Sequence, residues 1–114
     1  MKFGIVGSRH FADLARVESY VENLPRDARV VTGSASGVDA AATRAARRHG
    51  LSIQVLGASF EEARDQSVAA ARNQRLIDQC DVLVAFWDGA SRGTRATVDR
   101  ALDSGREVHV FIAK

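Results

Sequence analysis

Cysteine, proline and long apolar runs are scarce in this sequence of 114 residues, and neither sign of charge predominates. The single cysteine, Cys80, excludes an intramolecular disulfide and any zinc site built from several thiolates of this chain. No apolar run approaches the roughly 18 to 20 residues that a transmembrane helix needs. The first seven residues are too short for the apolar region of a signal peptide and end in a turn signal. We therefore expect a cytoplasmic protein.

Charge is nearly balanced, with 16 basic and 14 acidic residues and a net charge of +2. Proteins that bind nucleic acid in general carry a marked excess of basic residues, so this balance argues against nucleic acid as a partner. Arginine nevertheless outnumbers lysine by fourteen to two, and arginine is the better residue for bidentate phosphate contacts. Codon bias explains most of these arginines, and only those inside motifs count as candidates.

Strand and helix patterns alternate along the whole chain. Strands are predicted over 2–7, 28–32, 51–56, 82–87 and 107–112, and helices over 11–24, 38–49, 67–80 and from Thr94 onward. The stretch 57–66 is expected to be a loop, or partly helical. The alternation predicts one α/β domain, 1–114, with a parallel sheet covered by helices on both faces. Right-handed crossovers favour a Rossmann-like, doubly wound sheet of five strands in the order 3-2-1-4-5.

The strongest motif follows the predicted fourth strand and comprises Asp88, Gly89, Ser91, Gly93 and Thr94. Two glycines four apart, beside serine and threonine hydroxyls, form a tight turn at a helix start that can hold an anion. In the predicted strand order this turn lies at the switch point of the sheet, where ligands bind outside the carboxyl ends of the strands. The alternative is a simple helix N-cap by Ser91 or Thr94.

Another turn, Gly7, Ser8 and Arg9, follows the first strand, and it offers a sharp bend, a hydroxyl and an anion-binding guanidinium. Turn formation alone is the alternative. His10, beside it, is the histidine that we expect to face a ligand. The histidines show no metal-ligand spacing, so no metal site and no cofactor are predicted.

The turn after the second strand contains Gly33, Ser34, Gly37 and Asp39. It is neither the dinucleotide fingerprint nor a P-loop, but a turn of small residues before a helix can hold a phosphate or a carboxylate. The alternative is that Ser36 caps the helix while Asp39 complements its dipole. The pair Arg72-Asn73 lies inside a predicted helix, and taken alone it would be a solvated face.

Together the four motifs resemble the SLOG superfamily, Rossmann-like domains related to the lonely guy phosphoribohydrolases and the DNA-processing protein DprA. The resemblance rests on Gly-Ser-Arg, Gly-x-x-x-Gly-Val-Asp, Arg-Asn and Phe-Trp-Asp-Gly-x-Ser-x-Gly-Thr, and it covers residues 3–112. It implies that a nucleotide or nucleotide-derived ligand binds at the carboxyl edge of the sheet. The candidate site consists of the residues that match the family's motifs and of their neighbours within the same motifs. These residues are Gly7, Ser8, Arg9, Gly33, Ser34, Gly37, Asp39, Arg72, Asn73, Asp88, Gly89, Ser91, Gly93 and Thr94.

The resemblance also bears on catalysis. Lonely guy enzymes release a free base from a nucleoside monophosphate, and they use a helix arginine together with the glutamate of Pro-Gly-Gly-x-Gly-Thr-x-x-Glu. Arg72 resembles that arginine, but the glutamate position falls on Thr97, which cannot supply a carboxylate beside a developing oxocarbenium ion. We therefore expect a sensor or sequestering domain. The alternative is an N-glycoside hydrolase in which Asp39 or Asp88 replaces the glutamate.

Two further expectations concern partners. DNA binding in the manner of DprA is a third hypothesis, against which the near-neutral charge and the single candidate stacking residue, Trp87, argue. Relatives often pair through helices, and the alanines of the predicted helix 67–80 leave a homodimer open.

Overall fold

The computed structural model describes residues 1–57 and 66–113. In chain order the elements are β1 (Lys2–Gly7), α1 (Leu14–Glu22), β2 (Arg29–Gly33), α2 (Val38–Arg48), β3 (Ser52–Leu56), α3 (Gln66–Gln79), β4 (Val82–Trp87), α4 (Arg92–Asp103) and β5 (Glu107–Ile112). The predicted loop or partial helix at 57–66 falls, apart from its end residues, outside the described residues. Within the described ranges, no helix combines the length and the apolar character needed to cross a membrane.

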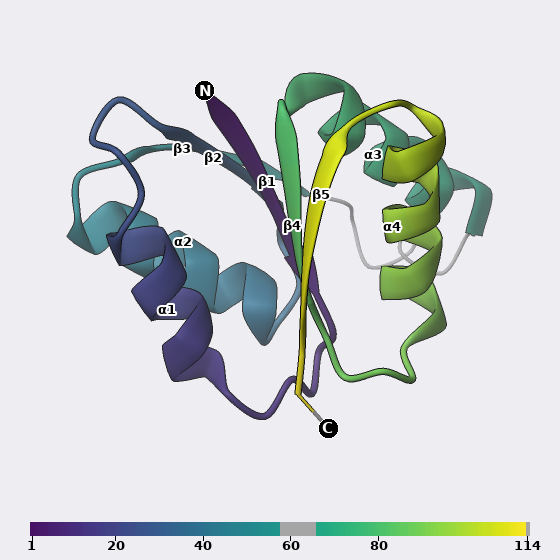
Figure 1. The fold of residues 1–114 in the computed structure, drawn as a ribbon, viewed down its shortest axis with the longest axis horizontal. Coiled ribbons are helices and arrows are strands. Elements are labelled where there is room, and N and C mark those ends of the chain that lie inside the picture. The colour runs from purple at the N-terminus through teal and green to yellow at the C-terminus, as the bar shows by residue number, and fades with distance from the viewer. Residues whose placement is uncertain (58–65, 114) are drawn as a thin grey trace.

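The five strands form one parallel sheet in the order β3-β2-β1-β4-β5, which confirms the predicted Rossmann-like architecture. Helices α1 and α2 lie on one face of the sheet and α3 and α4 on the other (Figure 1). Central strand β1 pairs with β2 on one side and with β4 on the other, so that Ile5 lies opposite both Thr32 and Val84. This register brings the ends of β1, β2 and β4 to one edge.

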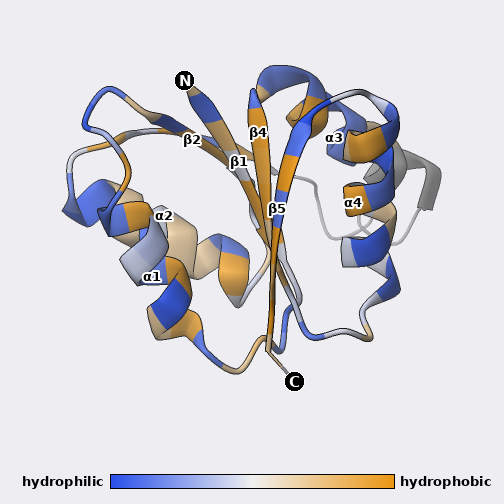
Figure 2. Cartoon of the chain, viewed as in Figure 1, coloured by the Kyte–Doolittle hydropathy of each residue, from blue (hydrophilic) through white to orange (hydrophobic). Residues whose placement is uncertain are grey.

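The central strands are apolar because both of their faces are covered. Five of the six residues of β4 are buried, and only Trp87 is partly exposed. Hydrophobic colour runs along β4, whereas the helices alternate between hydrophobic and hydrophilic bands (Figure 2). A continuous apolar run is the pattern expected of a parallel strand between two helical layers.

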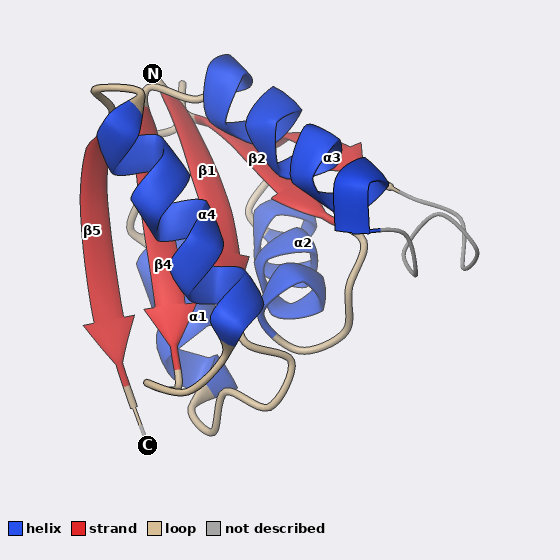
Figure 3. Cartoon of the chain, turned by 90° about the vertical axis from the view of Figure 1, so that its right-hand side faces the viewer, coloured by secondary structure: helices blue, strands red, loops and turns tan. Residues whose placement is uncertain are grey.

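One core lies between the sheet and the helices α3 and α4. Leu76 and Ile77 of α3 and Ala101 of α4 pack there against Leu83 and Ala85 of β4. Figure 3 shows both helices in front of the sheet, with α4 crossing it obliquely over β4 and β5. Cys80 is buried in the same core, and burial raises the pKa of its thiol, as expected of a small hydrophobe.

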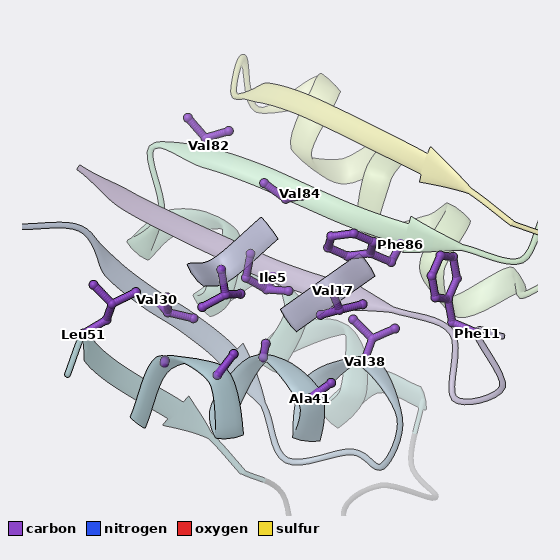
Figure 4. Close-up of a cluster of buried hydrophobic side chains, with 14 residues drawn as sticks. Ile5, Phe11, Val17, Val30, Val38, Ala41, Leu51, Val82, Val84 and Phe86 are labelled. Atoms are coloured by element: carbon purple, nitrogen blue, oxygen red, sulfur yellow. The ribbon is translucent and has the colours of Figure 1, made fainter. Parts of the chain in front are cut away.

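The other core lies beneath α1 and α2, and Figure 4 shows its side chains. Val17 of α1, together with Val38 and Ala41 of α2, packs there on Ile5 and Phe86. The small alanines let α2 approach the strands closely, which is the packing that the sequence of this helix favours.

The starts of α1 and α4 differ from those predicted, and the start of α2 lacks the suggested serine cap. Helix α1 begins at Leu14, not at residue 11, because the Asp13 carboxylate accepts a hydrogen bond from the Arg16 N–H at 3.2 Å and caps it. Phe11 lies in the preceding turn and packs edge-on against Phe86. The Ser36 cap is wrong, because Gly37 precedes α2 without a side-chain bond. Helix α4 starts at Arg92, two residues early, behind a Ser91 cap.

Close packing at the end of β1 predicts a strong effect of adding one methyl group. A β-carbon on Gly7 would lie 2.5 Å from the Phe86 carbonyl oxygen and 2.6 Å from Cγ2 of Val38. Gly7→Ala should therefore lower the free energy of unfolding by about 1 to 3 kcal/mol in urea denaturation. Gly93→Ala is the control, because among the described residues no heavy atom outside its chain neighbours and its own helix backbone lies within 4 Å of the added carbon, and it should be neutral or stabilising by up to about 1 kcal/mol. Equal losses in both variants would contradict the packing described.

Candidate functional site

A cavity of about 560 Å³ opens at the carboxyl ends of β1, β2 and β4. Its described lining is Val6, Gly7, Ser8, Arg9, His10, Gly33, Ala35, Asp39, Arg72, Asn73, Leu76, Asp88, Ala90, Ser91, Gly93, Thr94 and Thr97. All predicted site residues except Ser34, Gly37 and Gly89 are therefore gathered around one space. Its volume lies in the range of small-molecule sites.

The three predicted residues outside the lining belong to the turns that carry it. Gly37 has a φ of 79°, and a β-carbon there would collide with the carbonyl oxygen of Arg9. The glycine thus lets the turn after β2 close against the turn after β1. Gly89 also has a positive φ, in the exposed turn after β4. These two residues shape the site without lining it, and the Ser34 side chain is exposed.

Hydroxyl groups join the turn after β1 to the start of α4. Ser8 is buried, its N–H donates to the Phe86 carbonyl oxygen at 3.0 Å, and its Oγ accepts a bond from the Asp88 N–H at 3.1 Å. The Oγ1 atom of Thr94 lies 3.5 Å from Ser8 Oγ and 3.2 Å from Ser91 Oγ. The predicted turn residues therefore meet as one polar cluster on the cavity wall.

The predicted anion cradle at Gly89 to Thr94 is partly occupied by the chain itself. The Asp88 carboxylate accepts hydrogen bonds from the N–H groups of Ser91, at 2.7 Å, and Ala90, at 2.8 Å. These bonds, the one from Ser91 first, hold the pKa of Asp88 below its usual value. Two of the expected donors are therefore not available to a ligand, and a negative charge stands beside those that remain.

The remaining donors lie in the first turn of α4. The Ser91 side chain accepts a bond from the Thr94 N–H at 3.4 Å, which confirms the N-cap. Arg92 and Gly93 begin the helix, where N–H groups have no acceptor inside the helix, and they have no backbone partner in the described part of the chain. Together with the positive end of the helix dipole, these groups can bind an anion.

The opposite wall contains a buried carboxyl group. Asp39 is only 7% exposed, and its Oδ2 accepts a bond from the Ala35 N–H at 3.3 Å. Burial raises its pKa to about 6, although Arg72 and Arg9 act in the opposite direction. Gly33 makes room for this arrangement, because a β-carbon there would lie 2.6 Å from Asp39 Oδ2 and 3.4 Å from Arg72 Nη1. A carboxylate and a guanidinium therefore lie close together on the cavity wall.

Arg72 has a donor without an acceptor. Its Nη2 donates to the Asn73 side-chain oxygen at 3.2 Å, whereas its Nε is buried and has no hydrogen-bond partner among the described residues. A buried unpaired donor is rare and costly in proteins, so it needs an explanation. The side chain is partly buried on the cavity wall rather than on a solvated face. Other atoms of the side chain line the cavity, so a ligand there would reach the buried Nε once the guanidinium shifts toward it.

Thr97 occupies the wall where a lonely guy enzyme would have its glutamate. It is buried, and its Oγ1 donates to the Gly93 carbonyl oxygen at 3.0 Å. The hydroxyl is thus held by its own helix and is not a group that handles protons. The Nε1 atom of the partly exposed Trp87 donates to the Ser91 carbonyl oxygen at 2.9 Å, which fixes the indole beside the start of α4.

Sequence reasoning did not single out the apolar part of the lining, Val6 and Leu76. Leu76 lies four residues after Arg72 on α3, a spacing that places two side chains on the same helix face. Once Arg72 was a candidate, this spacing could have identified Leu76. Ala35 and Ala90 could not be found in this way, because nothing distinguishes an alanine inside a turn motif.

Comparison with known proteins identifies the fold and the family of this chain. A sequence model of the family described as DNA recombination-mediator protein A matches residues 1–80. The structure is similar to the X-ray structure of DNA processing protein A (DprA) from Streptococcus pneumoniae, with a TM-score of 0.85 and 22% sequence identity. The match covers 99% of this chain and 50% of that one, so this chain spans half the length of that protein. No curated protein matches the sequence.

The buried Asp39 predicts an unusual dependence of stability on pH. Its folded pKa of about 6 lies above the ordinary value of 3.8, so the unfolded chain loses this proton first as the pH rises. Ionisation of Asp39 should therefore cost stability between about pH 4 and pH 6, by about 3 kcal/mol at most. Asp39→Asn removes that loss. Its stability relative to the original protein should rise from pH 4.5 to pH 7.5 in urea denaturation, and a pH-independent difference would contradict the assignment.

Proposed function

The chain belongs to the DNA recombination-mediator protein A family, and we propose that its cavity binds a nucleotide or nucleotide-derived ligand, as a sensor or sequestering domain of SLOG type. The observation that carries the proposal is a set of donors around one cavity, namely the Arg72 guanidinium, whose buried Nε has no hydrogen-bond partner among the described residues, and the backbone N–H of Gly93 in the first turn of α4. Such donors need an anionic or carbonyl-bearing ligand. A nucleotide supplies both kinds of acceptor.

The phosphate of this ligand would lie at the start of α4. There the N–H groups of Arg92 and Gly93 point out of the helix, and the Ser91 and Thr94 hydroxyls lie beside them. Asp88 limits how much negative charge this position accepts. Because the described lining holds two arginines and two carboxylates, we infer a ligand with one phosphate group rather than a triphosphate.

The sugar or base would lie toward Asp39 and Arg72. A carboxylate that accepts and a guanidinium that donates, close together, can bind a group carrying both a donor and an acceptor. Ribose hydroxyls and the amide-like edge of a base have this character. Leu76 and Val6 supply an apolar surface beside them. The cavity thus offers one polar end for phosphate and a mixed wall for the remainder.

Family membership also changes the expectation about nucleic acid. The family name refers to DNA recombination and the similar solved structure is a DNA processing protein, so the expectation that argued against nucleic acid is not supported. A nucleotide within single-stranded DNA is therefore the second candidate ligand. Its phosphodiester carries a single negative charge, which suits a position next to Asp88.

A hydrolase is less well supported by the geometry than a binding domain. Thr97 has no carboxylate, and the Asp88 carboxylate is engaged with two backbone N–H groups. Asp39 remains as the other acidic group on the cavity. Release of free base from a nucleoside monophosphate during the binding measurements would show that the protein is a hydrolase.

Removal of the Arg72 guanidinium should weaken binding. We expect at least one ligand from a calorimetric panel of mononucleotides, cyclic nucleotides, ADP-ribose derivatives and short single-stranded DNA to bind. Arg72→Ala should reduce its affinity by about 10- to 100-fold, because one charge-assisted hydrogen bond contributes about 1.5 to 3 kcal/mol.

Arg75→Ala is the matched control, since Arg75 is exposed on the same helix and does not line the cavity. It should leave the affinity unchanged. No binding by any member of the panel, or equal losses in the two variants, would exclude the proposal.

Neutralising Asp88 should strengthen binding of the same ligand. Asp88→Asn retains an oxygen that can accept the Ala90 and Ser91 N–H groups while removing the negative charge. For unit charges about 7 Å apart in a water-like dielectric, this change is worth ~0.6 kcal/mol, or about threefold in affinity. The gain should shrink as salt concentration rises. An affinity that falls, or a gain that salt does not reduce, would place the phosphate elsewhere.

A further inference from the structure

Asp39 and Arg72 lie close together on the cavity wall without forming an ion pair. A β-carbon on Gly33 would lie 2.6 Å from Asp39 Oδ2 and 3.4 Å from Arg72 Nη1, so both atoms border the same small space. The ion pairs of the described chain do not include these two side chains, whose charged atoms are therefore more than 4.0 Å apart. Buried opposite charges are usually paired, because removing each from water alone is costly. The separation between this carboxylate and this guanidinium therefore needs an explanation.

Two layers of the fold hold the side chains apart. Asp39 lies in the first turn of α2, and its Oδ2 accepts a hydrogen bond from the Ala35 N–H at 3.3 Å. Arg72 lies on α3, and its Nη2 donates to the Asn73 side-chain oxygen at 3.2 Å. Helices α2 and α3 cover opposite faces of the sheet, so the two side chains reach its edge from opposite sides (Figure 1). Each charged group is thus attached to its own layer.

Both groups keep unused hydrogen-bonding capacity. Thr32 lies beside the Asp39 carboxyl group, but its hydroxyl donates to the Ile5 carbonyl oxygen at 2.7 Å, so its hydrogen is already engaged. Within the described part of the chain, the Ala35 N–H is then the one donor to a carboxylate that can accept about four bonds. Arg72 Nε is buried and has no partner among the described residues. The pair therefore presents acceptors on one side of a small space and donors on the other.

We propose that Asp39 and Arg72 select the base of the bound nucleotide, and that this base is a purine with a ring N–H beside a carbonyl oxygen, as in guanine. The inference rests on the nucleotide-binding function proposed above and names the base that the site prefers. The Asp39 carboxylate accepts from the N1–H and the amino group of guanine, and the Arg72 guanidinium donates to O6. Guanine carries these donors and this acceptor side by side on one rigid edge.

A base fits this wall of the cavity better than ribose does. Each ribose hydroxyl can donate or accept, so a sugar does not require an acceptor and a donor that are kept separate. The edge of a base has fixed donors and acceptors, which match a carboxylate on one side and a guanidinium on the other. Leu76 and Val6 line the same cavity, and Leu76 lies on the same helix face as Arg72. Their apolar side chains suit the flat face of a ring.

Adenine presents the opposite polarity in the same orientation. Its N1 carries a lone pair where guanine has an N–H, so it would face the Asp39 carboxylate without a bond. Its amino group would face the Arg72 guanidinium, where two donors meet. Phosphate bound at the start of α4 keeps the base from sliding to a better register. A site whose buried polar groups are left unpaired by the wrong ligand discriminates strongly against that ligand.

The first test compares nucleotides that differ only in the base. Calorimetry is done at pH 7.5, where Asp39, with a pKa of about 6, is ionised. Guanosine and inosine monophosphates, which share the ring N–H and the carbonyl oxygen, should bind at least about tenfold more tightly than adenosine monophosphate.

Equal affinities, tighter binding of adenosine monophosphate, or no binding by any of the three would overturn the inference. Equal affinities that fall when the ribose 2′-hydroxyl is removed would place the sugar beside Asp39 instead. Neither of these results would affect the proposed binding function, which fails only if no member of the larger panel binds.

The second test changes the preference through one atom of the protein. Asp39→Asn replaces an acceptor oxygen by an N–H₂ donor at the same place. It should lower the affinity for guanosine monophosphate about tenfold, because a charge-assisted bond is lost. It should raise the affinity for xanthosine monophosphate, in which a carbonyl oxygen takes the place of the guanine amino group. A gain in affinity cannot come from a misfolded variant.

Asp88→Asn is the matched control, because it makes the same exchange at another wall of the cavity. It should change the affinities for guanosine and xanthosine monophosphates by the same factor. If Asp39→Asn also changes both affinities by one factor, Asp39 acts only on the structure of the helix start, and the inference is wrong.

Discussion

The pairing of β1 with β4 is the constraint on which the candidate site depends. Ser8 binds the end of β4 twice, through its N–H to Phe86 and through its hydroxyl to the Asp88 N–H. That buried link holds the turn after β1 against the start of α4, although the two are about eighty residues apart in the sequence. Gly7 permits it, since any side chain there would meet the neighbouring strand and α2. Without this pairing, the hydroxyls, the helix start and the Arg72 wall would not surround one cavity.

Two ionisable side chains of the site, the buried Asp39 and the partly buried Arg72, work against the stability of the folded protein. A carboxyl group buried on one wall, and beside it a buried guanidinium nitrogen that has no partner among the described residues, raise the free energy of the folded chain relative to an apolar lining. Groups of this kind cluster where proteins bind or transform ligands. Asp88 has a double role in this arrangement, because it orders the turn and restricts the charge that the turn can accept.

The sequence predicted the fold well because its signals were local. Apolar runs such as Val82 to Trp87 and the regular alternation with helices were enough for the strand order, and the motifs fell at the ends of the correct strands. Three kinds of detail depended instead on individual side-chain contacts, some local and some between distant parts of the chain. The start of α1 was set by the Asp13 cap, and Phe11 left the helix to pack on Phe86. Only the three-dimensional structure shows that Asp88 occupies part of the anion cradle. It also shows that Gly37 packs against the turn after β1 and does not line the cavity.

The most direct test of the account is an NMR titration of the full chain with a nucleoside monophosphate. The backbone N–H signals of Arg92 and Gly93 and the side-chain Nε–H signal of Arg72 report on the unpaired donors themselves. The account predicts that these three signals show the largest and mutually concurrent shifts, because each gains an acceptor when the ligand enters. Saturable shifts confined to other surfaces, or an Arg72 Nε–H signal that does not move while ligand binds, would contradict it.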